Sequence, residues 1–432
     1  MMFATAGVNG QEFLTLWDCL AIASEKNIDI RSLEMLNEIN TEELKMTRTG
    51  LLPDISANAN ISEAIQDSRI RFIDDIIPPS EITGARTNGQ SMSLNTNLNF
   101  TSFAASIATN KAGRFNVLAQ ENSQIDEQNR ILLGIATAYL DALIRTETQT
   151  IFLHQVESSE NLFRIAEHQI KLGVMDSATY YQAMVHLEED YLSKAELEIQ
   201  VSYFTRELLR LIGLDKKEVV LDDLTNVNMA GLIVAQSSID SNAVLRQKQA
   251  EIQALKHAKR AGQINYLPSL SAFAAYGFSN QTFQNGIVVQ STYLGPSYGL
   301  GITYQLTSIK QAKHQVEIAK IQSDIALEQL LDIEVRLKND LDRINAEIEQ
   351  LKITIQIKEK LAEIAEMNLA AGITGFEVGR YSIFELRTFQ MSVLQAKLEA
   401  KASVTDLVYK QLEKLALTGD LKRVFLTQIN QP

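Results

Sequence analysis

Apolar residues in the segment 309–371 follow the spacing of a coiled coil. They recur at alternating intervals of four and three residues, and charged residues fill most of the positions between them. The apolar set is Leu337, Leu341, Ile344, Ile348, Leu351 and Ile355. This is the spacing of a helix with one apolar seam, and the segment holds no proline that would break it. The sequence therefore predicts one long helix that packs against other long helices.

Four other segments alternate apolar and uncharged polar residues with a period of two. They lie at about 54–65, 90–100, 268–279 and 297–306. This period predicts strands with one apolar and one polar face. Strands of about ten residues with this pattern are typical of a membrane barrel with a wet lumen, although the strands of a soluble sandwich alternate in the same way.

Aromatic residues give a second indication of a membrane barrel. If the strands run up and down, one group of aromatic residues falls at one end of the sheet and another group at the opposite end, as interfacial belts require. The first group is Phe100, Tyr266 and Tyr304, and the second is Tyr276, Phe278 and Tyr298.

The chain repeats one plan twice. Leu52-Pro53 and Leu267-Pro268 each open a pair of alternating segments, and a long helical segment follows each pair. Gly173 and Gly379 then precede a final helix in each half. The sequence therefore predicts a duplicated strand-strand-long-helix plan. The predicted parts are a first repeat at 11–213, an irregular segment at 214–238, a second repeat at 239–420 and a C-terminal tail at 421–432. Residues 1–10 are either the remnant of a signal peptide or a disordered tail.

Four strands per chain are too few for a barrel. Membrane barrels start at about eight strands, and unpaired strand edges are not tolerated in lipid. Two chains would supply eight strands and three chains twelve, and only the larger number leaves an open aqueous lumen. The pattern therefore predicts an oligomeric channel, with helices that project from the membrane because they are longer than a bilayer is thick.

Composition argues against several other classes of function. The net charge of -13 argues against a nucleic-acid partner, because phosphates require a basic surface. The only cysteine, Cys19, excludes an internal disulfide and is predicted to be a buried thiol. The five histidines form neither a His-x-x-x-His nor a Glu-x-x-His pair, so the ligands of a di-iron bundle are missing. We predict no catalytic residue, no metal site and no cofactor, and hence a protein that is not an enzyme.

Several short motifs, in the same order in both halves, resemble the TolC-type outer membrane factor family, also called outer membrane efflux proteins. They are Leu51-Leu52-Pro53, Ala136-Thr137-Ala138-Tyr139-Leu140, Tyr266-Leu267-Pro268-Ser269-Leu270-Ser271 and Val378-Gly379-Arg380-Tyr381-Ser382-Ile383-Phe384-Glu385-Leu386. The resemblance implies a mainly α protein with membrane β-structure, four strands of a shared twelve-stranded trimeric barrel, and a periplasmic α-helical barrel. It also implies a location in the bacterial outer membrane, extending into the periplasm.

The resemblance further implies a passive export duct in a tripartite efflux or type I secretion system. The implied partners are two further copies of the chain, a periplasmic adaptor, an inner-membrane transporter of the RND or ABC type, and outer membrane lipid. A coiled-coil scaffold of the cell envelope that forms no channel remains the alternative, and a helical enzyme is a third possibility without a ligand set to support it.

Site residues follow from the resemblance at the tunnel tip. Gly173 and Gly379, preceded by Leu172 and Val378, correspond to the adaptor docking turns, and Glu385 corresponds to an acidic ring at the tunnel entrance. Further gate candidates are Thr179 and Thr388, which stand at acidic positions of the family, and Asp176, which lies three residues before one of them. Tyr381 is another candidate, and Arg380 and Arg387 are candidate ion-pair partners between helices. Simpler explanations remain open, because glycine commonly ends helices and acids favour a first helical turn.

Overall fold

The computed structural model describes residues 13–70, 80–215, 219–222, 238–284, 288–421 and 424. They form two compact units. Unit 1 comprises Met1–Asn37, Glu121–Gln247 and Leu330–Pro432, and unit 2 comprises Glu38–Gln120 and Lys248–Gln329. Each unit thus contains segments of both sequence repeats. The expectations for 1–10, and for most of 214–238 and 421–432, lie outside the described residues.

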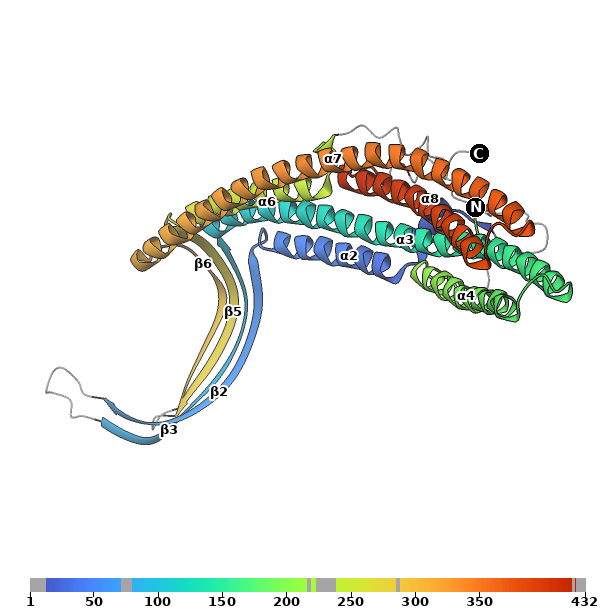
Figure 1. Ribbon diagram of the computed structural model, residues 1–432. Helices are drawn as coiled ribbons and strands as arrows, with labels where there is room; N and C mark the ends of the chain where they lie inside the picture. The colour runs from blue at the N-terminus through green and yellow to red at the C-terminus, as the bar shows by residue number, and fades with distance from the viewer. Residues whose placement is uncertain are drawn as a thin grey trace. The chain divides into compact units, whose positions relative to one another are not determined.

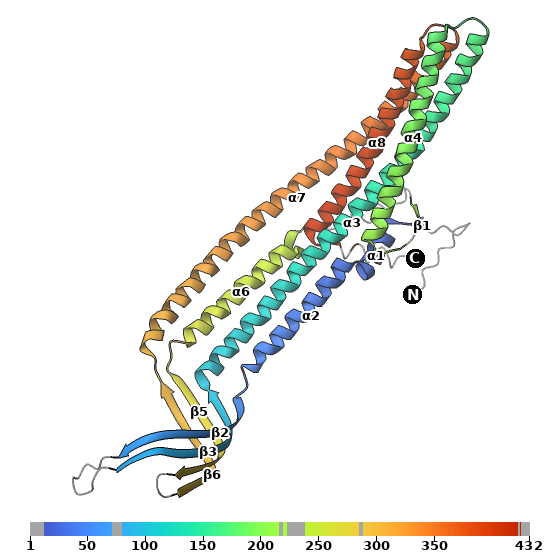
Figure 2. The same ribbon diagram turned by 90° about the horizontal axis from the view of Figure 1, so that it is seen from below.

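Unit 1 is built from helices (Figure 1). It contains α1 (Leu16–Lys26), α4 (Ser177–Leu211), the short 3-10 helix η2 (Ile239–Ser241) and α8 (Ile383–Thr418). It also contains parts of α2 (Ile28–Thr49), α3 (Phe100–Lys171), α6 (Ala243–Ile264) and α7 (Leu306–Glu377). Two hairpins, α3 with α4 and α7 with α8, turn at the same end of this unit (Figure 2). The long helix predicted at 309–371 is confirmed and is longer at both ends.

The predicted seam of α7 faces other helices. Leu341, Ile344 and Ile348 are buried, and Ile344 and Ile348 pack with Leu407 of α8. Charged residues on the outer positions form ion pairs along the same helix, such as Arg343 with Glu347. Exposed pairs of this kind add little to stability, so the buried seam supplies most of the attraction between the two helices.

The largest core of unit 1 includes a small sheet that the sequence did not predict. β1 (Phe13–Leu14) pairs in parallel with β4 (Val220–Leu221). Tyr139 of α3 is fully buried, and its hydroxyl lies 3.2 Å from the carbonyl oxygens of Leu14 and Asp222, to which it donates. Cys19 lies in the same core as a buried thiol, as predicted, and burial raises its pKa to about 12.

The duplication is visible in the packing of unit 1. Asn27 precedes α2, and its side-chain amide donates to the carbonyl of Leu211 at the end of α4. Asn242 precedes α6 and donates in the same way to Leu417 at the end of α8. Both distances are 2.7 Å, and both asparagines also cap the helix that follows them. The predicted duplication is therefore confirmed at the level of individual hydrogen bonds.

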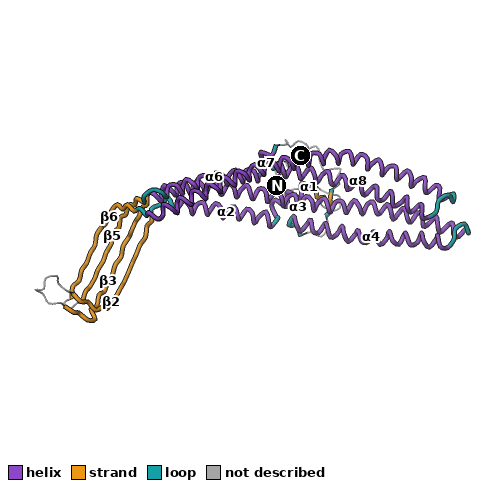
Figure 3. Tube along the Cα trace, turned by 60° about the vertical axis from the view of Figure 1, so that its left-hand side comes forward, coloured by secondary structure: helices purple, strands orange, loops and turns teal. Residues whose placement is uncertain are grey.

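Unit 2 contains a four-stranded antiparallel sheet in the order β2-β3-β5-β6 (Figure 3). The strands are β2 (Asp54–Ile70), β3 (Ser80–Asn99), β5 (Ser269–Gln284) and β6 (Val288–Thr303). All four extend beyond the ranges expected at 54–65, 90–100, 268–279 and 297–306, except at the helix junctions. There Phe100 begins α3, because Asn99 caps that helix, and Leu306 begins α7.

The start of β6 was predicted too late. Gly295-Pro296 suggests a turn in the sequence, yet both residues lie inside β6, where Pro296 is opposite Tyr276. Proline is tolerated in an edge strand because no ladder hydrogen bond is lost on the unpaired side, and β6 has only β5 as a neighbour. The longer strands also correct the aromatic pattern: Tyr276 and Tyr298 lie in the middle of their strands and not at a far end.

The two faces of the sheet differ as predicted. Tyr298, Leu300 and Ile302 of β6 lie on one face and are more than three-quarters exposed. The opposite face of the neighbouring strands carries uncharged polar residues, such as Asn95 beside Ser56. With the long helices and the duplicated plan, this pattern confirms the predicted fold class. Among the described residues, no helix is both long enough and apolar enough to span a bilayer.

Candidate functional site

The two hairpin ends of unit 1 have the same backbone geometry. Gly173 follows α3 with φ +72°, and Gly379 follows α7 with φ +77°. In both turns the glycine N–H bonds to the carbonyl three residues earlier, and the next N–H bonds to the carbonyl five residues earlier. These bonds define a Schellman motif, which favours glycine because its central residue is left-handed. The expected helix-terminating role of both glycines is therefore present.

The surroundings of these two glycines are open. A Cβ atom added to Gly173 or Gly379 would meet no atom within 4 Å. The preceding residues are exposed as well, with Leu172 at 64% and Val378 at 66%. Two turns thus present an apolar side chain and bare backbone to the surroundings, which is the kind of surface that a partner can contact closely.

The candidate acids at the hairpin ends both cap helices. Asp176 is the N-cap of α4 and accepts a hydrogen bond from the Thr179 backbone at 3.0 Å. In α8 the roles are exchanged: Ser382 is the N-cap, and Glu385 at the third helical position accepts from the Ser382 backbone at 2.7 Å. Each hairpin end thus has one carboxylate that caps the following helix, at the N-cap in the first repeat and at the third helical position in the second, which explains why the acid of the first repeat comes three residues earlier in the sequence.

These hydrogen bonds stabilise the charged carboxylates. In Asp176 the pKa is lowered by hydrogen bonds from the Thr179 hydroxyl and backbone, and in Glu385 by those from the Ser382 backbone and hydroxyl. Both groups lie at helix N-termini, where the dipole also favours negative charge. Both side chains are therefore anionic at neutral pH. Thr388, in contrast, uses its hydroxyl within α8, where it donates to the carbonyl of Phe384 at 3.0 Å.

Tyr381 and Arg380 lie in the turn before α8, which starts at Ile383. Tyr381 therefore does not share a helical face with Glu385. The ring of Tyr381 instead packs edge-on against Phe389, with centroids 5.6 Å apart. It covers the backbone of α7 at Gly375, where a Cβ atom would collide with the ring. The ring of Tyr381 thus packs between α7 and α8 next to their turn.

Arg387 pairs with a carboxylate on a neighbouring helix, as predicted, and this carboxylate lies outside the predicted set of tip residues. Its guanidinium bonds to both carboxylate oxygens of Asp190 in α4, at 2.7 and 2.8 Å. Ser159 and Gln155 of α3 bond to the same carboxylate at 2.6 and 3.2 Å. The Asp190 side chain is 3% exposed. Burial by itself would raise the pKa of Asp190, but the bonds from Arg387 and Ser159 lower it below the ordinary value.

The sequence gives little indication of a buried role for Asp190, because this residue ends the acidic run Glu188-Glu189-Asp190, which is typical of a solvated helix face. One signal was available in the spacing. The buried residues of α4 include Ala183, Leu187, Asp190 and Leu197, so Asp190 occupies a position of the apolar seam. An acid at such a position predicts a buried cation partner.

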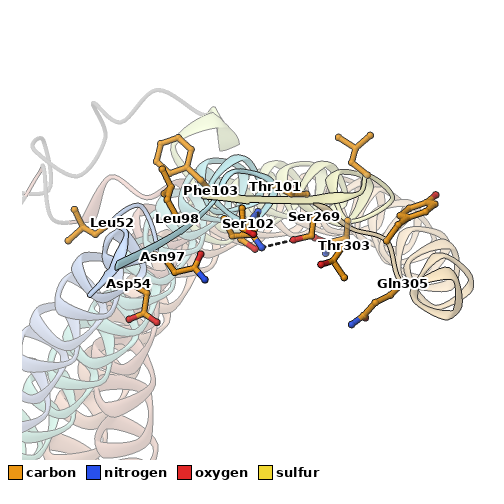
Figure 4. A pocket seen from close by; sticks show the side chains of 16 residues that line it. Leu52, Asp54, Asn97, Leu98, Thr101, Ser102, Phe103, Ser269, Thr303 and Gln305 are labelled. Carbon is orange, nitrogen blue, oxygen red and sulfur yellow. Dashed lines mark hydrogen bonds between the residues drawn. The ribbon is translucent and has the colours of Figure 1, made fainter. Parts of the chain in front are cut away.

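Unit 2 has an open depression of about 660 Å³ where the helices meet the sheet (Figure 4). Amide and hydroxyl side chains dominate its lining, and Asn99 of β3 donates to the hydroxyl of Ser269 of β5 at 2.6 Å. Asp54 is the one acid in the lining. Side chains of this kind form hydrogen bonds with water. In the described parts of the chain, no group of three or more His, Cys, Asp or Glu residues could hold a metal ion.

Comparisons with known proteins agree with this geometry. Residues 234–417 match the family described as outer membrane efflux protein. This part of the chain is therefore similar to outer membrane efflux proteins. The match confirms the predicted resemblance and the predicted location in the bacterial outer membrane, and it supports a general role as an efflux channel. No curated relative matches significantly.

Solved structures of outer membrane channels and proteins share the fold. The outer-membrane channel OprN has a TM-score of 0.77 at 12% identity, with 94% of this chain and 90% of that chain covered. For CmeC of Campylobacter jejuni the TM-score is 0.71 at 15% identity, with coverages of 94% and 86%. For VceC of Vibrio cholerae the values are 0.72 at 14% identity, with coverages of 94% and 96%.

Proposed function

We propose that this protein is the outer-membrane duct of a tripartite efflux or type I secretion system. Three copies form one twelve-stranded barrel. A periplasmic adaptor and an inner-membrane transporter of the RND or ABC type deliver small molecules or polypeptides to it. The duct is passive, because the transporter supplies the energy.

The four-stranded sheet of unit 2 carries this proposal. Its edge strands, β2 and β6, each have a single neighbour, and one face exposes large apolar residues such as Leu294 and Leu300. A bilayer tolerates no unpaired strand edge, so the edges of several copies must pair with one another. In a coiled-coil scaffold in water this apolar face would be exposed to solvent, and an exposed apolar face favours aggregation.

The hairpin ends support the two finer parts of the proposal. The open turns at Gly173 and Gly379, with Leu172 and Val378, would accept the adaptor. Three copies of Glu385 around a threefold axis would form an acidic ring that attracts cations, and Asp176 adds a second acid to each copy. Tyr381, Thr179 and Thr388 belong to the same tip, where they would set its width, and Arg380 would add a positive charge near the acids.

A matched pair of β6 variants tests the duct. Leu300→Lys places a charge on the apolar face, and Ser297→Lys places the same charge on the polar face of the same strand. We expect Leu300→Lys to prevent membrane insertion, because a lysine in the hydrocarbon layer is strongly unfavourable. Ser297→Lys should insert as a trimer and change the single-channel conductance. Mass photometry in detergent and planar-bilayer recordings measure both outcomes.

Two results would contradict the duct. The first is a wild-type protein that purifies without detergent as a monomer. The second is equal membrane insertion of both variants, since a soluble sheet would not distinguish its two faces in this way.

A further inference from the structure

Basic residues are concentrated where the helices of unit 2 join the sheet. The segments 44–53, 100–120, 252–268 and 304–316 contain no aspartate or glutamate, although the whole chain carries a net charge of -13. Their basic residues, here called the basic belt, are Lys45, Arg48, Lys111, Arg114, Lys256, Lys259, Arg260, Lys310 and Lys313. Such segregation of charge is not explained by solubility, which acidic residues would serve equally well.

The sheet register brings these four segments to the same end of the strands. Asp54 at the start of β2 is opposite Asn97 near the end of β3, and Ser269 at the start of β5 is opposite Thr303 at the end of β6. Thr101 at the start of α3 donates to the carbonyl of Pro268 at 2.7 Å. The four helices therefore join the strands at the same end of the sheet.

The helices remain neighbours beyond that end of the sheet. Asn110 of α3 donates to Thr47 of α2 at 3.3 Å, and Phe115 of α3 stacks on His257 of α6 with centroids 5.5 Å apart. A Cβ atom on Gly262 of α6 would lie 3.3 Å from Val316 of α7. The order α2-α3-α6-α7 repeats the strand order, so the residues of the basic belt lie on four neighbouring helices beside the same end of the sheet.

The belt is available to a ligand. Eight of its residues are exposed, and Lys259 is half-buried. Lys45 pairs with Glu42, while the other eight have no ion pair with a carboxylate in the part of the chain that the structure describes. At 1.5 Å per residue, all but the two α3 residues lie within about 12 Å of the helix ends.

Exposed apolar residues separate the belt from the sheet. At the junctions Leu52, Leu267, Leu306 and Tyr304 all have exposed side chains. The order along each element is thus an apolar sheet face, then exposed apolar or aromatic residues, then basic residues. This is the order in which a membrane presents hydrocarbon, the interface and charged headgroups.

We infer that the basic belt binds the phosphate groups of anionic phospholipids in the membrane leaflet nearest to the helices. The inference rests on the proposed function, because it places the apolar sheet face in the bilayer. Lysine and arginine near an anionic surface attract it within about a Debye length, roughly 8 to 10 Å at physiological ionic strength. The belt thereby fixes the depth of the sheet in the membrane and selects the lipids around it.

The test compares two fourfold variants of the full-length protein. The belt variant carries Arg48→Gln, Arg260→Gln, Lys310→Gln and Lys313→Gln, which are exposed positions near the sheet. The control carries Arg164→Gln, Arg206→Gln, Lys338→Gln and Lys360→Gln, which are exposed positions in unit 1. Both sets remove two arginines and two lysines. A third variant exchanges lysine and arginine at the four belt positions and so keeps the charge.

Native mass spectrometry of the delipidated protein measures the binding of phosphatidylglycerol and phosphatidylethanolamine. We expect wild type, the control and the charge-keeping variant to bind phosphatidylglycerol at least fivefold more tightly, and we expect this preference to fall as salt is added. The belt variant should lose most of the preference. Inorganic phosphate at the same concentration should not displace the lipid, since a free ion gains nothing from the apolar junction.

Three results would overturn the inference: a wild type without lipid preference, an equal loss in the belt and control variants, or displacement of the lipid by inorganic phosphate. A belt that faces the lumen would instead bind anionic cargo. The belt variant would then change ion selectivity in planar bilayers while its lipid preference stays that of wild type. In all these cases a conducting trimer would leave the proposed duct intact.

Discussion

Arg387 of α8 and Asp190 of α4 form a bidentate ion pair that joins the two sequence repeats inside one chain. Each side chain comes from the second helix of a hairpin, and Ser159 of α3 adds a third helix to the contact. Since the Arg387 side chain is 15% exposed and that of Asp190 is 3% exposed, either charge would be largely shielded from water if the other were removed. The pair therefore makes the two hairpins pack in one specific arrangement.

Removing one partner should destabilise the helical unit strongly. We expect Asp190→Leu or Arg387→Met to lower the free energy of unfolding by about 3–5 kcal/mol, because one buried charge remains unpaired. The double variant should recover much of the loss. Guanidinium unfolding in detergent, followed by far-UV circular dichroism, measures each value.

The half-exposed pair Lys397–Glu366 between α8 and α7 is the control for this cycle. Its coupling energy should stay below about 1 kcal/mol. A similarly small coupling between Asp190 and Arg387 would refute the specific role of the buried pair.

The contribution of Asp190 should depend on pH only in strong acid. Its pKa in the folded chain lies below the ordinary value of 3.8, so the unfolded chain takes up the proton first as the pH falls. The stability that the carboxylate provides is fully present above pH 3.8 and is lost as the pH falls through the folded pKa. The difference in melting temperature between wild type and Asp190→Asn should hence be constant from pH 7 to 5 and shrink in stronger acid. Shrinkage already between pH 7 and 5 would contradict this.

The sequence predicted those features that depend on periodic or local patterns. The seam from Leu337 to Ile355, the alternating strands and the glycine at each hairpin turn follow from spacing alone. It failed where the deciding partner is remote in the chain: Asp190 belongs to an acidic run until Arg387 lies beside it, and the β1–β4 pair is too short to leave a pattern. It also failed where position outweighs propensity, as with Pro296 in an edge strand.

Replacing Glu385 by glutamine tests the proposed acidic ring separately from the capping of α8. Glu385→Gln keeps the capping box, because glutamine can occupy the third helical position of that motif, and removes only the charge. We expect lower cation selectivity and weaker block by multivalent cations in single-channel recordings. Glu363→Gln removes an exposed acid from α7 and should change neither. If both variants behave alike, the constriction lies elsewhere, and Asp176 is the next candidate.

The paired asparagines should contribute equally to unit 1. Asn242→Ala removes a helix cap and leaves the carbonyl of Leu417 without this donor, so we expect a loss of about 1–3 kcal/mol. Asn27→Ala should lose a similar amount at Leu211. Serine at either position keeps the cap but cannot reach the carbonyl, so Asn242→Ser separates the two contributions. Unfolding titrations that find one asparagine indispensable and the other neutral would show that the duplication is not functionally symmetric.

Replacing the turn glycines by asparagine tests adaptor docking without distorting the turns. Asparagine tolerates positive φ, and a Cβ atom at Gly379 or Gly173 would meet nothing within 4 Å. We therefore expect Gly379→Asn and Gly173→Asn to assemble and melt as wild type does, yet to reduce export in cells at least tenfold by blocking close contact with the adaptor. Gly419 is the matched control, because it has φ +76° but its Cβ atom would lie 2.5 Å from the backbone oxygen of Ser241. Gly419→Asn should lower the melting temperature, which a tip variant should not. Full export by both tip variants would remove the docking role, whereas reduced export with a lowered melting temperature would assign these glycines to the turn alone.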